Sequence, residues 1–128
     1  MSIEWLREFC LSLPHTTETV QWKDALVFKV GGKMYAVANL EPGDHWLSLK
    51  CSDEEYPELI ERPGIFPAPY LARAHWIALE SETTLRRSEL QELLKCGHAL
   101  VIAKLPKRRQ AELAARKPVP KRRRKPVR

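Results

Sequence analysis

The feature that most constrains the fold is a β-hairpin pattern in the first third of the chain. Two runs rich in apolar and β-branched residues, Leu26–Val30 and Lys33–Ala38, flank the pair Gly31-Gly32. Glycine adopts the positive φ angles that a two-residue hairpin turn requires. Alternation in the first run places Phe28 on one face of its strand and Lys29 on the other. The pattern therefore predicts two adjacent antiparallel strands joined by a tight turn.

Helical periodicity precedes and follows this hairpin. Apolar residues at three- and four-residue steps predict a helix over residues 2–13, which a proline then ends. Ser88 and Gln91 have the spacing of a capping box, so a long amphipathic helix is expected there, with a weak point at Gly97. Pro106 can serve as the first residue of one more helix.

Further strands and a short helix are expected between these helices. Residues 19–22 form a short extended piece, and a third strand runs over residues 45–50. A short helix begins near Pro57, residues 65–71 form a loop or an edge strand, and residues 75–79 form a strand. The order is helix, three strands, short helix, one or two strands and long helix. This order is typical of an α+β fold, a two-layer arrangement with helices packed on one face of an antiparallel sheet.

Charge divides the chain into two parts. Residues 1–103 hold 10 Lys/Arg and 15 Asp/Glu and are acidic, with a net charge of −5. Residues 104–128 hold 12 Lys/Arg against the single acid Glu112, a net charge of +11. We expect one α+β domain over residues 1–115 and a basic tail over residues 116–128 that is disordered when free. No apolar run is long enough for a membrane helix and no secretory signal begins the chain, so the cytoplasm, including the nucleoid, is the expected compartment.

The basic tail predicts a polyanionic partner, DNA or RNA. Five consecutive cations can neutralise phosphates and release counterions, which gives affinity without sequence preference. Two lysines flank the hairpin glycines, where a wing would present them to phosphate, and Trp46 is the best candidate for base stacking. The candidate nucleic-acid-binding residues are Lys121, Arg122, Arg123, Arg124 and Lys125, with Lys107, Arg108, Arg109, Lys29 and Lys33.

Each of these features also has an ordinary structural interpretation. The tail can be a solvated segment, or one that touches any polyanion without a biological role. Cations at residues 107–109 can lie near a helix C-terminus because the macrodipole favours them there. Lysines beside a hairpin turn are often solubilising residues. The sequence alone leaves these alternatives open.

Four stretches of the chain resemble the MmcQ/YjbR family of small bacterial proteins. Their order and spacing carry the likeness, which spans about residues 2–113. The stretches are Val27–Tyr35, Pro69–Leu71 with His75–Ile77, Glu92–Leu94 with His98–Val101, and Lys104–Lys107.

The resemblance implies a two-layer fold of the order α-β(3)-α-β(2)-α. This fold is similar in shape to secretion chaperones and to the frataxin-like protein CyaY. Members of the family are usually called DNA-binding proteins, with a proposed double-wing surface. A Ser-Tyr pair that is common in the last helix of the family is replaced here by Gly97-His98.

Other classes of function find little support in the sequence. The three cysteines are far apart and odd in number, so we expect buried, reduced thiols. The histidines lack metal-ligand spacing, and the GxSxG, Walker and GxGxxG motifs are missing. We therefore expect no metal, no cofactor and no catalytic residue. The sequence predicts a nucleic-acid-binding protein, monomeric or weakly dimeric. The alternative is a protein-partner-binding module that uses the open sheet face.

Overall fold

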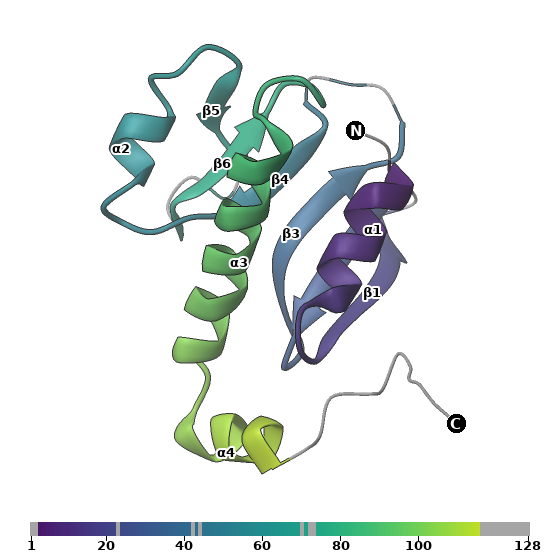
Figure 1. The fold of residues 1–128 in the computed structure, drawn as a ribbon, viewed down its shortest axis with the longest axis vertical. Helices are drawn as coiled ribbons and strands as arrows, with labels where there is room; N and C mark the ends of the chain where they lie inside the picture. The colour runs from purple at the N-terminus through teal and green to yellow at the C-terminus, as the bar shows by residue number, and fades with distance from the viewer. Residues whose placement is uncertain are drawn as a thin grey trace.

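The central hairpin belongs to a six-stranded antiparallel sheet in the computed structural model of the chain (Figure 1). Along the sheet the strands are ordered β1-β2-β3-β4-β6-β5. The strands are β1 (Thr16–Gln21), β2 (Ala25–Val30), β3 (Lys33–Asn39), β4 (Leu47–Lys50), β5 (Ile65–Pro67) and β6 (Trp76–Leu79). The helices are α1 (Ile3–Ser12), α2 (Tyr56–Leu59), α3 (Arg87–Ala103) and α4 (Lys107–Ala115). The structure describes residues 3–22, 24–41, 43, 45–69, 71 and 74–115.

The β2–β3 hairpin has the turn that its two glycines predict. Gly31 and Gly32 have φ angles of 61° and 83°, which glycine adopts without a steric penalty. The register shifts within the hairpin and leaves Tyr35 opposite no residue of β2. This β-bulge lets the Tyr35 side chain join the buried core, where its hydroxyl donates to the carbonyl oxygen of Cys10 at 3.3 Å.

The helices cover one face of the sheet and bury the main core against it. α1 packs on β1, and α3 packs across β2, β3 and β4 (Figure 1). Leu6 of α1 and Leu94 of α3 join Phe28 and Leu49 of the sheet in this core, and all four are fully buried. The opposite face holds a much smaller buried cluster centred on Trp76. The predicted two-layer α+β class is therefore confirmed.

Before α2 the sheet contains one more strand than the predicted order has. Four strands, not three, precede α2, because residues 16–21 form the complete edge strand β1. Its sequence, Thr-Thr-Glu-Thr-Val-Gln, is mostly polar, so the apolar alternation of a half-buried strand is missing. β1 is stabilised instead by its full pairing with β2 and by the ion pair between Glu18 and Arg7 of α1. For residues 65–71 the sequence left a loop or an edge strand open, and the structure has the edge strand β5 over Ile65–Pro67.

The predicted capping box at the start of the long helix is wrong. The N-cap of α3 is Arg86, two residues before Ser88, and no side chain caps it. The backbone N–H of Leu90 donates to the Arg86 carbonyl at 2.9 Å, so helical hydrogen bonding starts earlier than the motif indicates. The buried residue Leu85 lies immediately before this point. Burial of the chain against the core thus decides where the helix begins.

Gly97 is a site of close packing, although its residue type predicts a weak point in α3. It is buried, and a Cβ atom there would lie 2.7 Å from the carbonyl oxygen of Lys50 in β4. Real Cβ atoms do not approach an oxygen this closely. The absent side chain is therefore what allows α3 to lie directly on β4.

His98 makes the fold sensitive to acid. It is 6% exposed, and its Nε2 lies 2.7 Å from the Pro14 carbonyl oxygen, so the neutral ring donates a proton there. Burial lowers the pKa of His98 below its ordinary value of 6.5. The unfolded chain therefore takes up a proton at a pH where the folded chain does not.

We expect the free energy of unfolding to decrease as the pH falls through 6.5, the ordinary pKa of the exposed ring. Chemical denaturation between about pH 7.5 and 5 measures this decrease. The His98→Gln variant, whose amide can donate to Pro14, should flatten the pH profile in this range. An identical slope in both proteins would contradict the assignment. The carboxyl groups of Glu18, Asp53 and Glu89 have lowered pKa values, so they titrate at more acidic pH.

Candidate nucleic-acid interface

The turn of the β2–β3 hairpin packs against the junction between α3 and α4. A Cβ atom placed on Gly31 would lie 2.6 Å from Cδ1 of Leu105, which is the second residue after the end of α3. Leu105 is buried, as is Leu113 of α4, so both ends of this junction are anchored in the core. Two segments far apart in the sequence therefore meet at one end of the molecule (Figure 1).

Cations are concentrated where these two segments meet, and we call this surface the basic end. Lys33 follows the hairpin turn, Lys104 is the C-cap of α3, and Lys107 and Arg108 begin α4. All four of these side chains are exposed. The basic end comprises Lys29, Lys33, Lys104, Lys107, Arg108 and Arg109.

The first turn of α4 holds three of these cations against the direction of the helix dipole. Lys107, Arg108 and Arg109 are the first three residues of the helix. A helix N-terminus carries partial positive charge, so cations there are unfavourable for the helix itself. These cations also follow the C-terminus of α3 at Ala103, where the dipole of that helix favours them, so the structural interpretation stands beside the binding one. The same place suits an external anion, because the first N–H groups of a helix have no intrahelical partner.

Two cations of this region differ from the rest. Arg109 forms an ion pair with Glu112 at 2.9 Å, so its charge is partly compensated. Lys50, which the sequence did not single out, is only 9% exposed and donates from Nζ to the Ala74 carbonyl at 2.9 Å. Burial, with a smaller contribution from Lys104, lowers the pKa of Lys50. The one signal in the sequence for the burial of Lys50 was its place on a short strand that also carries Leu47 and Leu49.

Among the residues predicted to contact nucleic acid, the structure brings together the hairpin lysines and the cations of α4. Lys29 is half-buried on β2, and Lys33 is exposed at the turn. The run Lys121–Lys125 lies outside the described residues, as does the rest of residues 116–128.

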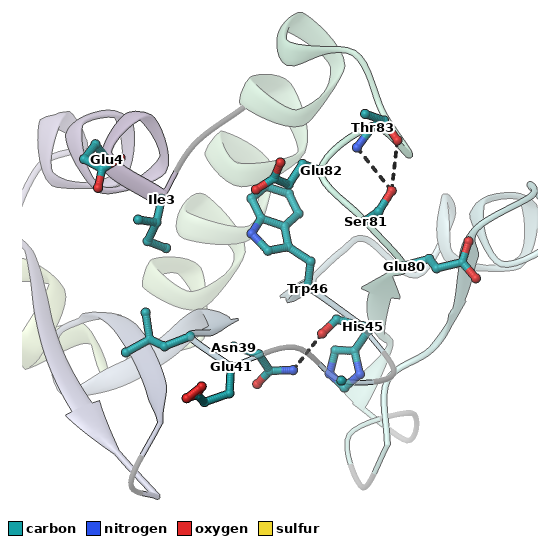
Figure 2. Close-up of a pocket in the computed structure, with 12 residues that line it drawn as sticks. Ile3, Glu4, Asn39, Glu41, His45, Trp46, Glu80, Ser81, Glu82 and Thr83 are labelled. Carbon is teal, nitrogen blue, oxygen red and sulfur yellow. Dashed lines mark hydrogen bonds between the residues drawn. The ribbon is translucent and has the colours of Figure 1, made fainter.

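The opposite end of α3 carries a hollow of about 640 Å³ lined by acidic side chains (Figure 2). The loop before α3 contributes two of the acids, and Trp46 lies in the middle with its ring half-buried against the core. Carboxylates repel phosphate, so this place is unfavourable for the base stacking that the sequence suggested for Trp46. The acidic side chains are Glu4, Glu41, Glu80 and Glu82.

The face of the sheet that the helices leave uncovered carries an apolar groove of about 350 Å³, which we call the open-face groove. The largest aromatic side chain at the groove is that of Trp22, directly after β1, with 65% of its surface exposed. Sequence reasoning missed Trp22 because nothing in its local pattern distinguishes an exposed tryptophan from a core one. The residues that line the groove include Trp22, Met34, Val37, Ser48, Pro69 and Leu71.

A histidine–aspartate pair lies at the surface near α2. His75 Nδ1 lies 2.5 Å from Asp53 Oδ1, and the ring stacks on Tyr56 at 4.6 Å between centroids. The nearby thiol of Cys51 donates to the His75 carbonyl, and burial raises the pKa of Cys51 to about 12. A thiol with this pKa is protonated at neutral pH, which makes it a poor nucleophile.

The described residues lack the features of a metal site and of a membrane-spanning helix. Within them, no three His, Cys, Asp or Glu side chains gather closely enough to hold a metal ion. The described helices include none with the length and apolar character needed to cross a membrane.

An open antiparallel sheet with helices on one face and a basic end defines a small α+β domain. The family model described as YjbR matches residues 11–100, and the chain belongs to this family. The predicted family resemblance is thus confirmed. No curated protein matches the sequence.

The solved structures that are similar to this chain include two bacterial proteins. A protein from Deinococcus radiodurans with a DUF419 domain is 35% identical, with a TM-score of 0.78 and 88% of each chain covered. A protein from Pseudomonas syringae is 24% identical, with a TM-score of 0.66, covering 78% of this chain and 98% of its own. The second likeness concerns the fold alone.

Proposed function

We propose that this protein binds nucleic acid through phosphate contacts at the basic end, without strong sequence preference. The observation that carries the proposal is the packing of Gly31 on Leu105, which joins the hairpin turn to the cations of α4. Exposed lysines and arginines on a common surface suit a phosphate backbone. The basic segment Lys121–Lys125 follows α4 in the chain and would extend the same contact.

The acidic hollow supports an oriented mode of binding. Its four carboxylates lie beyond the start of α3, whereas the cations lie at its end. A helix of 17 residues is about 25 Å long, so the two charged regions are separated by more than a Debye length at physiological salt. A polyanion would therefore be attracted to one end of the molecule and repelled from the other.

Neutralising the described cations of the basic end should reduce the salt dependence of binding. We expect the variant Lys104→Gln/Lys107→Gln/Arg108→Gln to lower the slope of log affinity against log salt by about 2 to 3 for duplex DNA, if each side chain neutralises one phosphate. Fluorescence anisotropy with labelled duplex DNA at several salt concentrations measures this slope.

The matched control removes three cations elsewhere. Arg62→Gln/Arg86→Gln/Lys95→Gln changes the net charge equally, and these side chains are exposed outside the basic end. The control should keep the slope of the unmodified protein. Equal effects of the two variants would mean that net charge alone acts, and a complete lack of binding near physiological salt would overturn the proposal.

A second candidate function is the binding of a protein partner on the uncovered sheet face. The open-face groove is the specific observation that favours it, because exposed apolar surface often marks an interaction site. Such binding would depend on the groove residues and would persist when the basic end is neutralised.

A further inference from the structure

We propose that the open-face groove accepts an unpaired base of a single-stranded nucleic acid, stacked on Trp22. This inference rests on the proposed function, and it adds the kind of nucleic acid that is preferred. Duplex DNA keeps its bases inside the helix, whereas a single strand can place them against an aromatic side chain. The groove and the basic end would then bind base and backbone of the same strand.

Trp22 has the exposure and backbone geometry of a residue held outward. It is 65% exposed, more than Val20 at 57% and Leu40 at 45%, the other exposed large apolar residues in the described part of the chain. Its φ angle of 51° is in the left-handed region, which is unfavourable for a bulky side chain. Both the exposure and the backbone strain cost free energy, and such costs are concentrated at functional positions.

The charge on this sheet face suits a polyanion. The register places Lys29 directly opposite Met34, which lines the groove, and Thr17 lies on the other side of Lys29. On this face the described strands carry two charged residues, and both are cations. Lys50 is buried and donates to the Ala74 carbonyl, so the half-buried Lys29 is the cation that a ligand can reach. Residues 1–103 have a net negative charge, so the positive charge on this face is not a consequence of the overall composition. A positive face attracts phosphate.

The groove comes nearest to the basic end at Met34. Met34 follows Lys33 at the hairpin turn, and this turn contacts Leu105 beside the first residues of α4. A groove of about 350 Å³ is at the small end of the range for ligand sites, which suits a planar ring system better than a folded segment. These observations favour a single strand over an apolar peptide as the occupant.

The test compares single-stranded and duplex DNA with equal numbers of phosphates, using the full-length protein and fluorescence anisotropy. We expect the single strand to bind more tightly than the duplex. The Trp22→Ala variant should bind the single strand roughly 5- to 160-fold more weakly, the range that the loss of one stacked base produces, with duplex affinity unchanged. Trp22→Phe should retain most of the affinity, since it keeps an aromatic ring.

The control variant is Leu40→Ala, which removes another exposed apolar side chain away from this groove. It should leave both affinities unchanged. Circular dichroism spectra and the melting temperature of Trp22→Ala, compared with those of the unmodified protein, show whether this variant is folded. Equal single-strand affinity in Trp22→Ala and the unmodified protein overturns the inference while leaving the proposed function intact.

Two other outcomes would also overturn it. If neither DNA binds near physiological salt, the proposed function fails as well. If a labelled peptide rich in Leu and Phe binds in a Trp22-dependent way while single-strand affinity does not depend on Trp22, the groove is a peptide site.

Discussion

Neutralising the five consecutive cations of the C-terminal segment is expected to produce the largest change in nucleic-acid binding. The variant replaces each residue of Lys121–Lys125 with Gln in the full-length chain. If each side chain neutralises one phosphate, the salt slope for duplex DNA falls by about 4 to 5. Between about 50 and 200 mM salt, the unmodified protein should then lose roughly 500-fold more affinity than the variant does. Anisotropy titrations at both salt concentrations measure the difference.

A charge-preserving variant serves as the control for this segment. Arg122→Lys/Arg123→Lys/Arg124→Lys keeps five cations but changes their shape. Since counterion release depends on charge, its slope should match that of the unmodified protein. If the neutralised variant keeps the full slope, the segment makes no phosphate contacts and the basic end of the described domain alone would account for binding.

The second large effect is on stability, and it is opposite in sign to what helix propensity predicts. Gly97→Ala should favour an isolated helix by about 1 kcal/mol. In the folded protein the new Cβ would lie 2.7 Å from the Lys50 carbonyl oxygen, so α3 or β4 must shift. The opposing atom belongs to the backbone and cannot rotate away as a side chain can, so this overpacking costs about 2–3 kcal/mol, the upper part of the usual range. We therefore expect a net loss of about 1–2 kcal/mol in the free energy of unfolding, with a melting temperature lower by roughly 4–16 °C.

Gly43→Ala is the matched control, because a Cβ atom there has no neighbour within 4 Å. Thermal melts followed by circular dichroism should show that this variant unfolds close to the unmodified protein. A melting temperature for Gly97→Ala equal to or above that of the unmodified protein would contradict the close approach of α3 and β4.

Local patterns were sufficient where local interactions dominate. The two glycines at residues 31–32 predicted the hairpin turn because only their φ preference is needed. The three- and four-residue apolar steps placed α1 and α3, since an amphipathic helix has its own periodicity. The family likeness was also carried by short stretches within residues 27–107, and it is confirmed.

The errors occurred where pairing and packing outweigh local preference. β1 was underestimated because a polar edge strand is stabilised by its neighbour β2 and not by an apolar pattern of its own. The start of α3 was misplaced because burial next to Arg86 outweighed the capping motif at Ser88. A glycine within a helix can be either a weak point or a place of close packing. For Gly97 the position of the opposing strand β4 decides between the two, and the sequence does not give that position.

The candidate site follows the same division. The charge asymmetry between residues 1–103 and 104–128 can be read from the sequence, because charge is a property of each residue alone. The arrangement of those charges cannot, because the contact of Gly31 with Leu105 joins segments that are distant in the chain. The same applies to Trp22 and Trp46. Both are tryptophans in mixed surroundings, and the packing of the sheet leaves one exposed beside a groove and places the other among carboxylates.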